Sequence, residues 1–357
     1  MSFALNEVIE IYGEGNVLAI GGAVIGVLFG FFAQRSKFCL RAAVIDFWHG
    51  HFKDKLSIWL LAFSAAVIAT QALVLWAGLD SSGARQIAAR GSLSGAMVGG
   101  LMFGVGMILT RGCASRLLIL SANGNLRALL SGLIFAVVAQ SSLSGALMPA
   151  RLYISEWSTL DGGSGRDLLA MAGVGHATGL AIGVVCFVMA IYFVSRSTSK
   201  PVMLWVGGIG TGLSVAAAWG FTQWVAKNSF EPIQIQGLTF SGPSAEWLMR
   251  VLQSPAPKIG FEFGLLPGVF LGSFLGAMAG SEFKLEGFKD GYSMRRYIAG
   301  AVLMGFGSML AGGCAIGAGV TGGAIFALTA WVTLVGMWLG AGITDRWLDS
   351  PANHRHP

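Results

Sequence analysis

The chain has 357 residues, of which 11% are charged and 54% hydrophobic, and its 23 Lys and Arg exceed its 17 Asp and Glu to give a net charge of +6. Soluble domains carry about 25% charged residues. With a mean hydropathy of +0.69, this composition excludes a soluble globular enzyme, a disordered chain and a disulfide-stapled secreted module. It predicts a polytopic membrane protein, whose basic excess lies in loops between apolar runs and does not indicate nucleic-acid binding.

Uncharged runs mark the predicted membrane helices in chain order. The first seven runs cover 17–33, 56–79, 93–109, 128–148, 168–194, 201–226 and 263–281. The eighth, 297–344, would be about 70 Å long as one helix, against a hydrocarbon core of about 30 Å. Glycines from Gly312 to Gly323 interrupt it. We therefore expect an all-α membrane protein with about nine inclined transmembrane helices and an irregular break at membrane depth near Cys314.

An internal repeat accompanies this break. Four residues recur in the same order 201 positions later in the sequence. The first set is Gly104, Gly106, Gly112 and Cys113, and the second set is Gly305, Gly307, Gly313 and Cys314. A weaker match joins two sets of three glycines. The first set is Gly22, Gly26 and Gly30, and the second set is Gly268, Gly272 and Gly276. Glycine at every fourth residue is also typical of close helix packing.

The repeat predicts how the chain is organised. We expect a single membrane domain over 1–357. Within it, 1–160 forms a first repeat-like half with two of the cysteines, 161–262 holds intervening helices and an external loop, and 263–345 forms a second repeat-like half.

Loop charges predict the sidedness of the chain, because basic loops favour the cytoplasmic side. Residues 1–16 carry three Glu and no Lys or Arg, so we place the N-terminus outside and expect no cleavable signal. The basic segments 34–55 and 282–296 are placed inside. The loop 227–262, whose basic residues are sparse, is placed outside.

Three of the four cysteines share a context. Cys39, Cys113 and Cys314 each follow an apolar run at the point where the helical pattern stops. Cys186 instead lies in the middle of a run, which is typical of a small buried hydrophobic residue. The three are therefore candidates for a functional site.

Neither a metal nor a cofactor is predicted. The cysteines show no CxxC and no zinc spacing. Four histidines have no matching set of ligands: His49, His51, His354 and His356. No glycine-rich loop continues into Gly-Lys-Ser/Thr, so we do not expect ATP hydrolysis by this chain.

Several strings carry a resemblance to a known family. TRGCASRLL covers 110–118 and is followed by SANGNLRALLSG at 121–132; GGCAIGAGVTGG covers 312–323, and RSKFC covers 35–39. In this order and spacing they resemble the YeeE/YedE family of bacterial inner-membrane sulfur-compound transporters, over essentially the whole chain.

The resemblance implies uptake of thiosulfate across the bacterial inner membrane, and not an enzyme. It implies an hourglass-like fold of inclined transmembrane helices with short re-entrant half-helices. It also implies one cysteine per motif along the substrate pathway: Cys39, Cys113 and Cys314. A separate cytoplasmic sulfurtransferase that resembles TusA is implied as a partner, because this chain carries no such soluble domain.

The chemistry of the substrate suits these motifs. Thiosulfate is a dianion with three oxygens and a soft terminal sulfur. Half-helix N-termini and exposed backbone N–H groups favour anions, and a neutral thiol is a weak donor that can face sulfur. The neighbouring residues are therefore predicted to support the pathway: Arg111, Gly112, Ser115, Arg116, Gly313 and Gly317. For the two arginines, an electrostatic funnel for anions and a membrane-interface anchor are both open.

Two other functions stay open from the sequence. A transporter of another sulfur or selenium species would carry similar motifs. A membrane thiol enzyme would use a thiolate to take sulfane sulfur as a persulfide and release sulfite, although no His or other base stands beside the cysteines. A carboxylate proton relay has no clear candidate, since few acidic residues lie within the apolar runs.

Overall fold

The fold is seen in a computed structural model, which describes residues 11–52, 55–196, 202–229, 231–252, 254, 259–287 and 291–348. The described chain is helical apart from one antiparallel pair of two-residue strands, β1 (Gly91–Ser92) and β2 (Thr159–Leu160). Eight of its helical segments are long and apolar enough to cross a membrane. The prediction of an all-α polytopic membrane protein is confirmed.

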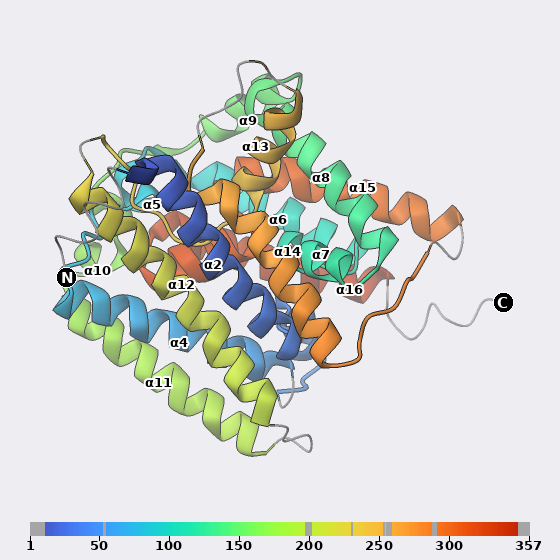
Figure 1. Ribbon diagram of the computed structural model, residues 1–357, viewed down its shortest axis with the longest axis horizontal. Coiled ribbons are helices and arrows are strands. Elements are labelled where there is room, and N and C mark those ends of the chain that lie inside the picture. The colour runs from blue at the N-terminus through green and yellow to red at the C-terminus, as the bar shows by residue number, and fades with distance from the viewer. Residues whose placement is uncertain are drawn as a thin grey trace.

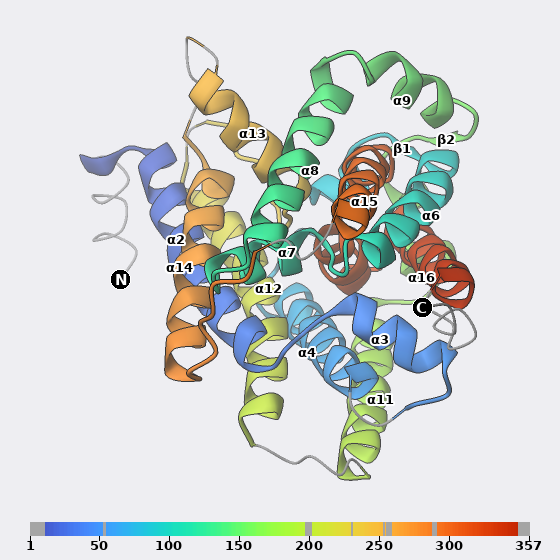
Figure 2. The same cartoon turned by 90° about the vertical axis from the view of Figure 1, so that its right-hand side faces the viewer.

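Long helices form the body of the molecule, as Figures 1 and 2 show. Within the described residues they are α2 (Glu14–Arg35), α4 (Lys55–Trp76), α6 (Leu93–Leu109), α8 (Leu126–Ser144), α11 (His176–Ser195), α12 (Val202–Asn228), α14 (Phe261–Ala279), α15 (Gly291–Leu310) and α16 (Leu328–Leu348). They match the nine predicted segments. The helix α16, which carries Asp345 and Arg346 near its end, is not among the eight apolar spans.

Shorter elements connect the long helices. They are α3 (Leu40–Trp48), α5 (Arg85–Ala88), α7 (Ala114–Ala122), α9 (Met148–Ser155), η1 (Ser164–Arg166), α10 (Leu168–Met171), α13 (Ser241–Leu252) and η2 (Ala315–Gly322). The helix η2 has π geometry, which is rare and is found frequently at functional sites.

The glycines of α2 and α14 lie face to face and let the two backbones touch. A β-carbon on Gly26 would lie 2.6 Å from the carbonyl oxygen of Leu265, and one on Gly268 would meet the backbone of Ala23. The helices run parallel along this seam (Figure 1). The glycines at every fourth residue, which we predicted as a weak repeat, thus allow the close packing of one helix pair.

The helix α6 lies between α15 and α16, and glycines again make the contact. A β-carbon on Gly99 would lie 2.5 Å from the carbonyl oxygen of Gly307 in α15, and one on Gly100 would lie 2.6 Å from that of Thr333 in α16. The two segments that match at the offset of 201 positions therefore pack directly against each other.

The loops after α2 and α14 lie at the same end of the molecule. Lys37 Nζ and Glu282 Oε1 are 3.1 Å apart and join them. This agrees with the placement of 34–55 and 282–296 on one side. We call this end the Lys37 end, and the opposite end, where Figure 2 shows α9 and α13, the α9/α13 end. Residues 1–10, with two of the N-terminal glutamates, and the histidines near the C-terminus lie outside the described residues.

Candidate functional site

Three copies of one local structure carry the three candidate cysteines. Each copy is a long helix, a turn and a short helix, and the cysteine is the N-cap of the short helix: Cys39 for α3, Cys113 for α7 and Cys314 for η2. The prediction that each helical pattern stops just before its cysteine is confirmed.

The turn is the same in all three copies. The residue two positions before the cysteine has a left-handed backbone, with φ +54° at Lys37, +59° at Arg111 and +75° at Gly312. The next residue donates its backbone N–H to the carbonyl five positions earlier, at distances of 3.1, 3.2 and 2.9 Å. This is the Schellman end of a helix, and it turns the chain so that the next residue starts a new helix.

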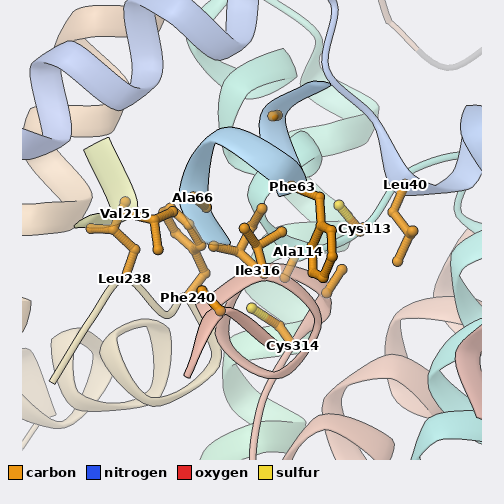
Figure 3. Packing of buried hydrophobic residues seen from close by; sticks show 14 of the residues in the cluster. Leu40, Phe63, Ala66, Cys113, Ala114, Val215, Leu238, Phe240, Cys314 and Ile316 are labelled. Atoms are coloured by element: carbon orange, nitrogen blue, oxygen red, sulfur yellow. The ribbon is translucent and has the colours of Figure 1, made fainter. Parts of the chain in front are cut away.

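The three thiols come together inside the protein. Both Cys39 and Cys314 lie close enough to Cys113 to interact with it electrostatically. Cys113 and Cys314 are each 1% exposed, and Cys39 is half-buried. Figure 3 shows Cys113 and Cys314 within one cluster of buried side chains that includes Phe63 and Ile316. In this conformation the hydrophobic cluster closes the space around the two buried thiols.

The polar partners of the buried thiols come from the short helices themselves. The Sγ of Cys113 lies 3.4 Å from the buried hydroxyl of Ser115, and the Sγ of Cys314 accepts the backbone N–H of Gly317 at 3.4 Å. Gly317 has no room for a side chain, since a β-carbon there would lie 2.5 Å from the hydroxyl of Thr239. Two of the predicted supporting residues thus contact the cysteines.

The two glycines before Cys113 and Cys314 are buried, and they differ in the space that a β-carbon would have at each position. A β-carbon on Gly313 would lie 2.9 Å from the backbone nitrogen of Ala318, so the turn before Cys314 needs glycine. A β-carbon on Gly112 would meet its neighbours at ordinary contact distances.

The two predicted arginines have different surroundings. Arg111 is exposed beside the turn before Cys113. Arg116 is half-buried and donates to Gln34 Oε1 at 3.3 Å, while Gln34 donates to Glu282 at 2.7 Å. Arg116 therefore belongs to a hydrogen-bonded chain that joins α7, α2 and the loop after α14, and Arg111 is exposed at the turn.

A cavity of about 360 Å³ opens at the α9/α13 end and reaches Gly312 and Gly317, on either side of Cys314. Four arginines line it, against Glu156 as an acidic neighbour: Arg85, Arg90, Arg151 and Arg166. We call it the arginine-lined cavity. Its position places a strongly cationic space next to the N-terminus of η2, which also favours anions.

Arg166 is the most buried of these arginines, at 5% exposure. It donates to the hydroxyl of Thr329 at 2.7 Å and to the carbonyl of Ala89, and its Nε has no partner. Within the described part of the chain, no ion pair joins it to a carboxylate. Burial lowers the pKa of Arg166, yet an arginine keeps its charge. A buried cation without a counter-ion is costly unless an anion binds there.

These arginines are not among the predicted site residues. They come from separate short elements, which only the fold brings together. Arg85 lies in α5, Arg90 just after it, Arg151 in α9 and Arg166 in η1. One sequence signal points to them: arginines are disfavoured in loops placed outside the cell, and these lie at the end that loop charges place outside.

No group of three or more His, Cys, Asp or Glu side chains in the described ranges has the arrangement of a metal site. His49 pairs with Asp345 at 2.8 Å instead.

Comparisons with known proteins agree with the motifs. The family described as "Sulphur transport" matches residues 35–343. The chain is 26% identical to the "Thiosulfate transporter TsuA" of Escherichia coli K12, over 93% of this chain and 94% of that protein. It is 27% identical to the "Thiosulfate transporter TsuA" of Spirochaeta thermophila, over 91% and 98%.

A shorter stretch, 38% of this chain, is 30% identical to the "Probable transporter YedE" of Escherichia coli K12, of which it covers 33%. These matches confirm the resemblance to the YeeE/YedE family. Since the matched region contains all three cysteine motifs, the chain belongs to the sulphur transport family.

Proposed function

We propose that the chain takes up thiosulfate across the bacterial inner membrane, along a route from the arginine-lined cavity past Cys314, Cys113 and Cys39. The observation that carries the proposal is the threefold structure of turn, cysteine and short helix, whose thiols lie close enough to interact. The names of the relatives support thiosulfate as the substrate.

Capture begins in the arginine-lined cavity. Its cations raise the local concentration of a dianion, and Arg166, whose Nε has no partner, gains a counter-ion when the anion binds. The N-terminus of η2 adds backbone N–H groups that face negative charge. From there the anion passes to the first thiol, Cys314.

The thiols read the terminal sulfur. A protonated thiol donates weakly to a soft acceptor, whereas a thiolate would repel the dianion. Three spaced weak contacts permit both entry and release, as conduction requires. Sulfate has no terminal sulfur, so it shares the arginines with thiosulfate but not the thiol contacts.

Passage requires movement, because the buried cluster around the thiols is closed in this structure. Phe63 and Ile316 pack beside the thiols, and Cys314 is the N-cap of η2, which has the rare π geometry. A shift of η2 toward α-helical winding is the motion we expect to open the route.

A thiol enzyme is disfavoured by the same contacts. The partners of the buried thiols are the hydroxyl of Ser115 and the N–H of Gly317, and neither is a general base that would form a thiolate. A separate cytoplasmic sulfurtransferase, as a partner on the Lys37 end, stays a prediction.

Uptake of labelled thiosulfate tests the proposal, in cells that lack other thiosulfate importers and with excess unlabelled sulfate. We expect uptake that resists sulfate and is lost in Cys314→Ala and Cys113→Ala. Cys186→Ala is the matched control, because Cys186 lies in α11 outside the site, and it should transport normally.

Full uptake by both site variants, at wild-type protein levels, would contradict the proposed route. Mass spectrometry after incubation with thiosulfate separates the enzyme alternative. A persulfide on a site cysteine adds about 32 Da, roughly one sulfur atom, and the transport hypothesis predicts that the thiols stay unmodified.

A further inference from the structure

A buried carboxyl group lies at the α9/α13 end, outside the cysteine route. Glu262 is in the first turn of α14 and is the one charged residue in that helix. Its side chain is 9% exposed. It faces a second cavity of about 200 Å³, which Glu246 and Arg250 of α13 also line. The mechanism proposed above does not use this group.

A second carboxyl group, that of Glu246, lies beside Glu262. The Oε1 of Glu262 accepts from Arg85 at 3.4 Å, while its buried Oε2 has no donor among the described residues. Glu246 lines the same cavity as Glu262, and the two carboxyl groups interact electrostatically. Two neighbouring carboxylates repel each other when both are ionised, and one proton bound by the pair removes this repulsion.

The charged groups around Glu262 can be named for each element packed on α14. Glu246 and Arg250 come from α13, and Arg85 comes from α5. The helix α2 has charges only at its ends, Glu14 and Arg35. Arg116 of α7 lies at the Lys37 end, bonded to Gln34. Arg85 therefore contacts Glu262 directly, and Glu246 is the second acidic residue in the cavity that Glu262 faces.

Arg85 connects this pair to the arginine-lined cavity. Its side chain lines both cavities and is about half exposed. A contact of 3.4 Å is long for a charged hydrogen bond. Arg85 therefore loses little interaction free energy when it turns from Glu262 toward an anion in the larger cavity. When it does so, Glu262 loses its cation and a negative charge arrives nearby.

We infer that Glu246 and Glu262 form a proton-binding pair that takes up one proton when the transported anion occupies the arginine-lined cavity, with Arg85 as the link. The proton enters from the α9/α13 end, where Glu246 is exposed. On release of the anion, Arg85 returns to Glu262 and the proton leaves. This inference rests on the proposed function, since the anion is thiosulfate.

Thermodynamic linkage predicts the direction in which pH changes the affinity for thiosulfate. If anion binding takes up a proton, then added protons must strengthen anion binding by the same free energy. Thiosulfate stays a dianion near neutral pH, so its own charge does not change. The dissociation constant should fall as the pH falls, by up to about tenfold per pH unit while the pair titrates.

Two measurements on purified full-length protein in sodium-free buffer test the inference. Equilibrium binding of labelled thiosulfate is measured at steps between about pH 5 and 8, so that a slope of up to about tenfold per pH unit can be seen. Proton uptake on binding is measured with a pH-indicator dye in weak buffer. We expect tighter binding at low pH and up to one proton taken up per anion.

Variants separate the pair from other titrating groups. Glu262→Gln mimics the protonated acid, so it should bind thiosulfate about as tightly at every pH as the wild type does at low pH, without proton uptake. Glu246→Gln changes an exposed residue, so it should fold, and it should take up fewer protons. Glu231→Gln removes an exposed carboxylate in a loop outside both cavities and should match the wild type.

The outcomes distinguish the two proposals. Thiosulfate binding that is independent of pH in the wild type, or that keeps its pH dependence in both pair variants, overturns the inference alone. The absence of thiosulfate binding at every pH overturns the proposed function and the coupling with it.

Discussion

Lys37 and Arg111 occupy left-handed turn positions where the equivalent residue in the third motif is Gly312. A left-handed backbone costs an ordinary residue about 1–2 kcal/mol relative to the right-handed form, and glycine avoids this cost. The turn alone would therefore favour glycine at all three positions. Lys37 also pairs with Glu282 and so has a role in the fold, whereas the exposed Arg111 is better explained by attraction of an anion than by the turn.

Replacing Arg111 separates these explanations. Arg111→Gly keeps the turn, so the free energy of unfolding should stay equal or rise by about 1 kcal/mol, while uptake at low thiosulfate concentration should fall. Thermal unfolding and uptake are measured on the same preparations. Ser281→Gly is the matched control, because Ser281 has the same left-handed turn without a charge (φ +53°). If both variants transport alike, Arg111 is only a turn residue.

Arg166 is predicted to dominate anion capture in the arginine-lined cavity. Loss of a hydrogen bond to a charged ligand costs about 1.5–3 kcal/mol, so Arg166→Gln should raise the KM for thiosulfate roughly ten- to hundredfold. Arg90→Gln, at an exposed position in the same cavity, should have a smaller effect. The KM values from initial rates of uptake decide this, and equal effects would contradict a special role for the buried arginine.

The sequence pattern marks the cysteines as site residues, but it does not show that the arginines share one cavity. Each cysteine stands beside a local break in an apolar run, which a linear pattern shows. Arg85 and Arg166 are 81 positions apart, and only the folded chain brings them to one cavity. Glu262 looks like an ordinary acidic residue in a first helical turn until its contact with Arg85 is seen.

At the scale of elements, the apolar runs predict the long helices because hydrocarbon thickness sets their length. The run 93–109 coincides with α6 at both ends. The run 168–194 is divided, because Gly173 takes a left-handed backbone with φ +67° between α10 and α11. The short helices are too brief to show a period, and no sequence pattern marks the π geometry of η2.

The seam between α2 and α14 gives a prediction at this scale. Gly26→Val places a side chain against the backbone of Leu265, so α2 and α14 must move apart, at a cost of roughly 1–3 kcal/mol for overpacking. We expect a lower unfolding temperature in detergent. Gly132→Ala in α8 is the control, because its β-carbon meets nothing within 4 Å, and it should be neutral or stabilising. A stable Gly26→Val variant would mean that the seam is not tight.

The whole molecule presents cations at both ends of the cysteine route. Four arginines line the cavity at the α9/α13 end, while Lys37 and Arg111 lie in the turns of the other two motifs. An anion therefore meets positive charge where it enters and where it leaves. This distribution appears only once the loops are arranged in space.

Electrostatic capture should depend on salt. Screening lengths shorten from about 30 Å at 0.01 M to about 3 Å at 1 M, so the KM for thiosulfate should rise with ionic strength while the maximal rate changes little. Uptake into proteoliposomes in salts of weakly binding ions measures this. The slope should flatten in a variant with Arg90→Gln and Arg151→Gln. A KM that does not change with salt concentration would indicate that long-range electrostatic attraction does not contribute to the capture of thiosulfate.

The shortness of α3, α7 and η2 has a consequence for biosynthesis. Helices of 9, 9 and 8 residues reach about 13 Å, too little to enter a bilayer as independent spans. They can settle only after the long helices have inserted and associated to shield their ends. The thiols thus stay apart in the nascent chain and meet in the last step of assembly, so their protection from alkylating reagents marks the moment at which a newly made molecule is complete.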